Sequence, residues 1–167
     1  MKFLLSTYQN NYSKIVKYSL LVIFISILGF KANTEIPAKY KIETSLPKCK
    51  GADYTKWTDC YGEYVFPRIE YKGEWKNGAF DGQGILKEAW GGIYVGGFKN
   101  NLAEGYGRQE EEDGSWWEGE IKNDKLHGKG IYHNYDGTIF EGNFFEGFLQ
   151  VQGVYTKVNG TRATGNC

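Results

Sequence analysis

The sequence has little of what enzymes and metalloproteins usually require. It contains two histidines, His127 and His133, and no P-loop, nucleophile elbow, Cys-x-x-Cys or His-Glu-x-x-His motif. The acidic run 110–113 lacks the spacing of a calcium-binding loop and is expected to be a solvated turn. The sequence therefore predicts a protein that is not an enzyme and has no cofactor, catalytic residue or metal site.

Proline and methionine are also scarce. The 167 residues include three prolines and one methionine, against 23 glycines and 17% aromatic residues. This composition suits tightly turned strands better than helices. The length allows one ordinary domain with short appendages.

The sequence has no basic stripe. Residues 71–160 hold nine lysines and arginines against fourteen aspartates and glutamates, a net charge of −5. Phosphate contacts need clustered basic side chains, so we expect no nucleic-acid partner and no docking on anionic lipid head groups.

Only one long apolar run occurs, at residues 19–30, after Lys14 and Lys17. About twelve apolar residues are typical of a signal peptide and fall short of the roughly 20 that span a bilayer. We therefore interpret residues 1–32 as a signal peptide, with an uncleaved N-terminal membrane anchor as the alternative. The mature chain is expected in the periplasm or outside the cell, or else anchored to the inner membrane through this run.

The rest of the chain repeats with a period of 23 residues. Each repeat opens on an aromatic residue, has glycine two places later and an apolar residue two places after that. The residues expected in the repeat core are Tyr71, Gly73, Trp75, Tyr94, Gly96, Phe98, Trp117, Gly119, Ile121, Phe140, Gly142 and Phe144. A second glycine series follows at Gly84, Gly107, Gly130 and Gly153. A fixed period of this length indicates a repeat architecture.

Each repeat has the pattern of a β-hairpin. Apolar and charged residues alternate from Tyr71 to Lys76, as in a half-buried strand. Residues that tolerate positive φ follow, at 77–78, 100–101, 123–124 and 146–147, and a second strand begins near the second glycine. The predicted fold is all-β, an elongated single-layer antiparallel meander of hairpins that stabilise one another by stacking.

The pattern resembles the MORN repeat (membrane occupation and recognition nexus), with consensus YxGxWxxGxxxGxG. Residues 71–84 match it nearly throughout, and residues 117–130 match it well. The second repeat has Asn101 in place of the turn glycine, and the fourth has Val151 where the others have glycine. The resemblance covers about residues 60–165 and implies an interaction module. Membrane-surface association, which the family name suggests, is the alternative function.

The remaining segments complete the domain plan. Residues 33–48 are expected to be a linker, after an N-terminal segment that does not pack on the sheet, and residues 49–70 a degenerate capping repeat before the array at 71–167. Shifting the register by 22 residues places Cys49 and Cys60 on opposite strands of one degenerate hairpin. Export then favours a disulfide between them, with Trp57 covering the end of the sheet and two reduced thiols as the alternative. The role of Cys167 stays open.

Several aromatic residues lie off the repeat pattern. Trp90, Tyr106 and Trp116 are the candidate partner-binding residues, because clustered exposed aromatic rings mark binding surfaces. The alternative is that they extend the core of a thin sheet. The expected partner is a protein, a peptide or a glycan, bound by a non-enzymatic scaffold of the cell envelope.

Overall fold

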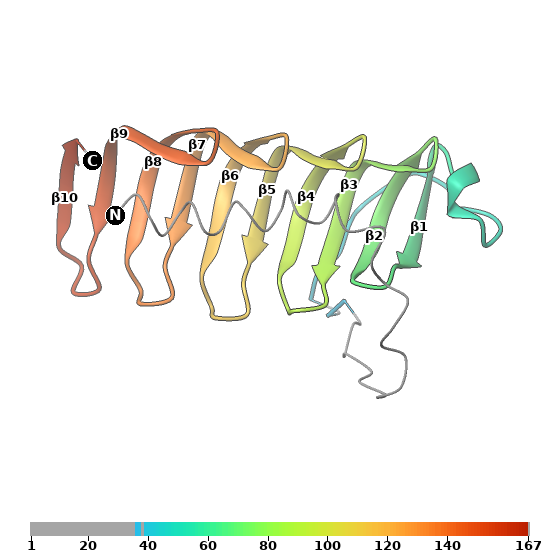
Figure 1. Cartoon of the computed structure of the whole chain (residues 1–167), viewed down its shortest axis with the longest axis horizontal. Coiled ribbons are helices and arrows are strands. Elements are labelled where there is room, and N and C mark those ends of the chain that lie inside the picture. The colour runs from blue at the N-terminus through green and yellow to red at the C-terminus, as the bar shows by residue number, and fades with distance from the viewer. Residues whose placement is uncertain (1–35, 38, 167) are drawn as a thin grey trace. The chain divides into compact units, whose positions relative to one another are not determined.

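The described residues form one antiparallel sheet of ten strands, which follow one another in chain order (Figure 1). The computed structural model describes residues 36–37 and 39–166. The elements are η1 (Tyr54–Lys56), β1 (Cys60–Val65), β2 (Ile69–Lys76), β3 (Ala79–Glu88), β4 (Ile93–Lys99), β5 (Leu102–Glu110), β6 (Trp116–Lys122), β7 (Lys125–His133), β8 (Ile139–Phe145), β9 (Phe148–Thr156) and β10 (Arg162–Asn166). The predicted all-β meander of hairpins is confirmed.

Two sequence predictions concern residues outside this range. The apolar run 19–30 and Cys167 lie outside the described residues. The helical content of the described part is the single short turn η1, so it holds no helix long and apolar enough to cross a membrane.

One glycine from each strand lies in a single row across the sheet. Each glycine of the row is the direct cross-strand partner of the next: Gly62, Gly73, Gly84, Gly96, Gly107, Gly119, Gly130, Gly142, Gly153 and Gly165. The two glycine series of the sequence are therefore one structural feature, because the antiparallel register brings them side by side.

The glycine row makes room for aromatic rings. A Cβ atom added to Gly84 would lie 2.5 Å from Cε2 of Tyr71, and one added to Gly107 would lie 2.3 Å from the hydroxyl oxygen of Tyr94. The Tyr71 ring lies against Gly73 as well as Gly84, and its hydroxyl donates to the carbonyl of Glu74 at 2.9 Å. The ring can reach that carbonyl only because the row carries no side chains.

The rings on this side of the sheet form a continuous core, and we call this side the core face. The Tyr71 ring stacks on Phe80 with centroids 3.8 Å apart, and Phe98 contacts both Tyr71 and Tyr94 edge-on. Tyr94 in turn lies 6.1 Å from Trp117. The hairpins are thus joined by aromatic contacts, which add to the burial of apolar area.

The predicted core residues differ in how deeply the structure buries them. Those buried are Tyr71, Gly73, Trp75, Tyr94, Gly96, Phe98, Trp117, Gly119, Ile121 and Phe144. Phe140 and Gly142 are only half-buried, with the Phe140 ring 4.8 Å from Tyr155. The core is therefore densest in the first repeats and thins toward the C-terminal end.

The hairpin turns tie each repeat to the one before it. Both turn residues have positive φ in Asn77-Gly78, Asn100-Asn101, Asn123-Asp124 and Glu146-Gly147, as the sequence predicts. The second residue of each turn donates its N–H to a carbonyl 21 residues earlier, in the pairs Gly78–Trp57, Asn101–Phe80, Asp124–Ala103 and Gly147–Leu126. These bonds run along the turn edge of the sheet and give Trp57 the place that Phe80 has in the next repeat.

The capping segment has a disulfide but not the predicted hairpin. Cys49 and Cys60 are bonded, with 2.08 Å between their sulfur atoms, and the ring of buried Trp57 lies 5.0 Å from Trp75. Residues 49–51 form no strand. Instead, Lys48 pairs with Tyr61 in a parallel bridge, and this bridge brings the two cysteines together.

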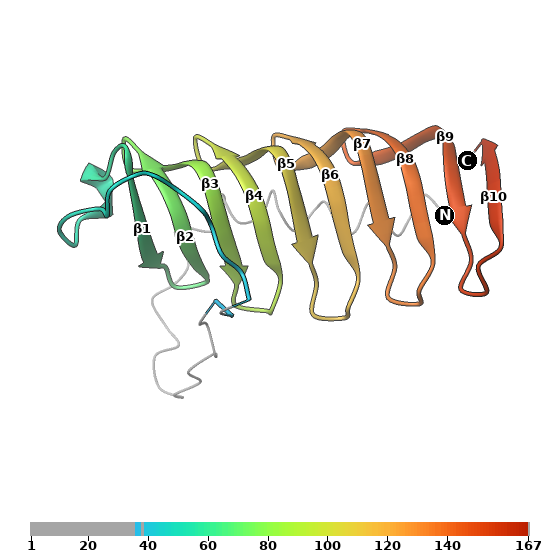
Figure 2. The same cartoon turned by 180° about the vertical axis from the view of Figure 1, so that it is seen from behind.

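The expectation that residues 33–48 form a linker is wrong for the described residues 36–37 and 39–48. They cross the sheet on the side opposite the core face, in front of β1–β3 in Figure 2. Ile36 is buried with Ile85 and Ile93. The reason is that these two isoleucines point away from the aromatic core, and the preceding segment covers them.

A buried polar cluster lies at the turn between β3 and β4. Glu88 is 4% exposed and Gln109 is 1% exposed. Their side chains, with that of Glu111, converge on Gly92, within 2.9–3.3 Å of where its Cβ would be. The pKa of Glu88 is raised to about 7, mainly by burial; a hydrogen bond from Trp90 acts against this shift, and the charge of Glu111 adds to it.

The steric role of the glycine row is tested by Gly84→Ala. Because the new methyl group would collide with the Tyr71 ring, we expect a loss of about 1–3 kcal/mol in the free energy of unfolding, measured by urea denaturation. Gly130→Ala is the matched control in the same row, since its nearest neighbours are side-chain carbons of Leu126 and Phe144 at 3.2 Å. Equal losses in both variants would contradict the proposed role of the ring.

The raised pKa of Glu88 predicts pH-dependent stability. The folded chain holds the proton up to about pH 7, whereas an ordinary glutamate loses it near 4.5. Stability from this group is therefore complete below about pH 4.5 and is lost as pH rises through 7. Glu88→Gln should abolish this slope and be more stable than the wild type at pH 8 by about 2–3 kcal/mol.

Thermal or urea unfolding between pH 5 and 8 measures the effect of Glu88. Glu112→Gln, an exposed residue near the same cluster, is the control and should keep the wild-type slope. A slope that survives in Glu88→Gln would assign the titration to another group.

Candidate functional site

The side of the sheet opposite the core face is the candidate site, and we call it the strap face. Its central row contains one side chain from each strand, in direct cross-strand register: Glu63, Lys72, Ile85, Val95, Arg108, Glu118, Ile131, Glu141, Val154 and Thr164. This row mixes charged and β-branched residues in no regular order. The strap face is therefore neither a plain solvated surface nor a second core.

The chain itself occupies the first half of this face. We call residues 36–48 the strap; it contacts residues of each strand from β1 to β5. Lys48 pairs with Tyr61, and the Thr44 hydroxyl donates to the Glu74 carboxylate. Ile36 packs on Ile85 and Ile93, and the Tyr40 hydroxyl donates to the Glu110 carboxylate at 2.5 Å.

Residues 40–48 of the strap are extended, with alternate side chains facing the sheet, and they follow a turn in which the Tyr40 N–H donates to the Pro37 carbonyl at 3.0 Å. Tyr40, Ile42, Thr44 and Leu46 are half-buried, while the odd-numbered residues from Lys39 to Pro47 are exposed. This period of two marks an extended segment with one face buried. It is also the signal in the sequence that could have shown that this segment packs on the sheet.

Charged and hydrogen-bonding contacts hold the part of the strap that lies over β5. The hydroxyl of Tyr40 is the main cause that lowers the pKa of the Glu110 carboxyl, and the Lys39 ammonium, 3.1 Å away, adds to it. Arg108 contacts the other oxygen of the same carboxylate at 3.1 Å. Glu110 is therefore held ionised between the strap and the rest of the face.

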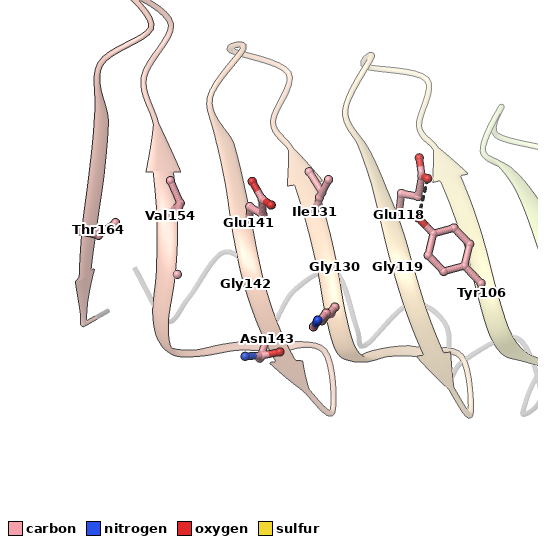
Figure 3. Close-up of a pocket in the computed structure, with 12 residues that line it drawn as sticks. Tyr106, Glu118, Gly119, Gly130, Ile131, Glu141, Gly142, Asn143, Val154 and Thr164 are labelled. Atoms are coloured by element: carbon pink, nitrogen blue, oxygen red, sulfur yellow. Dashed lines mark hydrogen bonds between the residues drawn. The ribbon is translucent and has the colours of Figure 1, made fainter.

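The second half of the strap face is open. A hollow of about 830 Å³ extends over β5 to β10 (Figure 3). Its lining includes one side chain from each of these strands: Tyr106, Glu118, Ile131, Glu141, Val154 and Thr164. Figure 3 shows Ile131, Glu141 and Val154 on neighbouring strands, with Tyr106 and Glu118 joined at one end.

Two of the three aromatic residues predicted to bind a partner lie on this open half. Tyr106 is 61% exposed and donates its hydroxyl to Glu118 at 2.7 Å. Trp116 is half-buried between the side chains of Arg108 and His133. The Arg108 guanidinium lies 3.9 Å from the centre of its ring, and the His133 ring stacks at 5.2 Å.

Trp90 does not join them. It is 46% exposed and lies on the turn between β3 and β4, beside the buried Glu88. The sequence analysis grouped Trp90 with Tyr106 and Trp116 as candidate partner-binding residues. The structure separates them because Trp116 begins a strand and turns its ring onto the strap face.

Arg108 and Glu118 are site residues that the sequence analysis did not identify. Arg108 bonds Glu118 at 3.0 Å and so links Tyr106 with Trp116 in one network. The hydrogen bond from Tyr106 is the main cause that lowers the pKa of Glu118. Their signal in the sequence was weak, because isolated charges on a strand normally face solvent.

The two histidines have structural surroundings. His127 lies 3.8 Å from Glu146 and 5.0 Å from the Phe145 ring, and His133 lies against Trp116. No group of three or more histidine, cysteine or acidic side chains in residues 36–37 and 39–166 is arranged to hold a metal ion. What the strap face offers is therefore a binding surface of aromatic, charged and β-branched side chains.

Comparison with protein families matches the repeats one by one. The family described as MORN repeat matches residues 71–92, 94–116, 117–139 and 140–162, with the four starts at the positions that the period of 23 residues predicts. A search of curated proteins gave no match. The four segments are consecutive, cover more than half of the chain, and each forms one hairpin with its glycines in the common row. The chain belongs to the MORN-repeat family.

Proposed function

We propose that this protein is a non-enzymatic scaffold of the cell envelope that binds a protein partner through the open half of the strap face. The observation that carries the proposal is the division of this face. Residues of β1–β5 already hold an extended segment of the chain, whereas β5–β10 present a hollow of about 830 Å³. A face that binds polypeptide along one half is suited to bind it along the other.

The composition of the open half supports a protein as the partner. Exposed Tyr106 and half-buried Trp116 are of the residue types that contribute most to protein interfaces. Carboxylates and β-branched side chains alternate around them. A lipid surface is less suitable, because Glu118 and Glu141 would face anionic head groups.

The disulfide supports the location of the scaffold. Cys49 and Cys60 are bonded in the capping segment, and Cys60 is 7% exposed. Such bonds persist in oxidising compartments and are rare in the cytosol. This agrees with export of the chain by the apolar segment at its N-terminus.

The binding surface is tested by site-specific photo-crosslinking in living cells. A photoreactive amino acid at Glu141, on the open half, should yield a discrete protein adduct. The same residue at Val158, a 70% exposed turn position, is the control and should not. Equal adducts from both positions, or none from Glu141, would refute the surface.

Vesicle sedimentation tests the alternative function. The purified chain should show no preference for anionic over neutral vesicles, because the repeat region carries a net charge of −5. A preference for anionic vesicles that is lost at high salt would favour membrane-surface association instead.

Export also predicts an oxidised Cys49–Cys60 pair. Mass spectrometry of the protein from cells, without reduction, should find the two peptides linked. Replacing both cysteines by serine should cost about 2–3 kcal/mol in the free energy of unfolding, because the disulfide restricts the unfolded chain. Two free thiols in the protein as isolated would contradict export.

A further inference from the structure

Three residues that hold the strap recur two repeats further along the sheet. A shift of 46 residues places Glu74 on Glu120, Ile85 on Ile131 and Ile93 on Ile139. The pairing is equivalent as well, since Ile85 lies between Lys72 and Val95 and Ile131 lies between Glu118 and Glu141. A shift of one repeat gives no such match, because it places Ile85 on Arg108 and Ile93 on Trp116.

The side chains are also placed alike. The Glu74 carboxylate lies over Gly82, and the Glu120 carboxylate lies over Gly128, each within 2.4 Å of where the Cβ of that glycine would be. Both glycines have positive φ, near 106° and 108°. The acceptor that binds the Thr44 hydroxyl in the first half therefore has a counterpart in the same setting in the second half.

The two sets differ in what covers them. Ile85 is 0% exposed and Ile93 is 8% exposed beneath the strap, whereas Ile131 and Ile139 are only half-buried. Glu74 is half-buried and Glu120 is exposed. The additional exposed surface of the second set is the area that an occupant like the strap would bury.

We propose that the open half is a second strap site that binds a segment of a partner protein shaped like the strap, a turn followed by an extended chain. The segment has a β-branched residue against Ile131 and Ile139 and, eight residues later, a hydroxyl residue at Glu120. These positions correspond to Ile36 and Thr44 of the strap. This inference rests on the proposed function and names the chemistry of its partner.

Two substitutions between the halves refine that chemistry. Val95, which packs with Ile42 of the strap against the same isoleucine cluster, is replaced by Glu141, and Glu110, which holds Lys39 and Tyr40, is replaced by Thr156. The partner therefore carries a basic residue where the strap has Ile42 and needs no Lys-Tyr pair. Arg162 lies 3.7 Å from Glu141, but both side chains are more than half exposed, so a partner cation can replace it.

The same substitutions argue against a second copy of this chain as the occupant. Its strap would place Ile42 against the Glu141 carboxylate, and Lys39 and Tyr40 would find Thr156 in place of a carboxylate acceptor. A strap already held by its own sheet would also lose those contacts before it could bind another molecule.

Labelled peptides test the site on the full chain. One peptide has the sequence of residues 36–46, and the second carries Ile42→Lys. We expect saturable binding of the second peptide in fluorescence anisotropy, at least tenfold tighter than that of the first. On the protein side, Ile131→Asp should weaken this binding at least tenfold, whereas Val158→Asp, at an exposed turn, should leave it unchanged.

An exchange of charge between protein and peptide identifies the contact. Because one peptide should gain affinity, a folding defect of the variant could not explain the result. Glu141→Lys should weaken binding of the Ile42→Lys peptide and strengthen binding of an Ile42→Glu peptide. Because Ile131 and Glu141 lie outside the contacts of the strap, these effects also distinguish the second site from displacement of the chain's own residues 36–48.

Other outcomes would overturn the inference. No saturable binding, equal affinity for the two peptides, or binding that survives Ile131→Asp would each refute the second strap site. Concentration-dependent dimers in light scattering that Ile131→Asp abolishes would assign the face to a second copy. If the peptides fail while the crosslink from Glu141 persists, the scaffold function stands and only the strap-like partner is wrong.

Discussion

The packing of tyrosine rings against paired glycines is the contact on which the first repeats depend. Tyr71 and Tyr94 lie so close to their glycines that a methyl group there would overlap the ring. Their hydroxyls then reach the backbone carbonyls of Glu74 and Gly97. A single sheet has no second layer to bury its aromatic side chains, so its rings must lie flat on backbone and on one another. The glycine row makes this possible.

This solution leaves the strap face unprotected. The core face takes the repeating aromatic residues, such as Tyr71, Tyr94 and Trp117, and the side chains of the opposite face lie outside that cluster. Polar residues tolerate that position, but Ile85 and Ile93 do not, and the strap covers them. The strap thus behaves as a short second layer over half of the sheet. Where it ends, at Glu110, the network of Arg108, Glu118 and Trp116 begins and leads into the open half.

The sequence predicts the fold well because each structural requirement of the hairpin recurs four times, at intervals of 23 residues. Positive φ at Asn77 and Gly78, glycine at the row and an aromatic residue beside it all recur, so no single departure, such as Asn101, obscures the hairpin. The strap has no second copy, and its alternation from Tyr40 to Leu46 is short, which is why it resembles a linker. The two cysteines were paired correctly from a hairpin that does not exist, because a parallel bridge at Tyr61 brings them equally close. The aromatic residues of the site could be predicted from the sequence. Which of them lie together could not, because that depends on the side of the sheet to which each side chain points.

Recurrence on the two faces of the sheet has different causes. On the core face, each repeat must supply a ring and a glycine or the stack is interrupted, so similarity between repeats there follows from stability alone. The strap face has no such requirement: its central row carries lysine, isoleucine, valine, arginine and glutamate in turn. A set of Glu, Ile and Ile that returns after two repeats, in the same register and with the same carboxylate placement, therefore needs a reason outside the core. In the first half that reason is visible, since the set binds an extended chain. The equal set in the second half, left more exposed, is a binding surface of the same kind, and the new charge at Glu141 with the loss of the Glu110 charge at Thr156 selects a different segment.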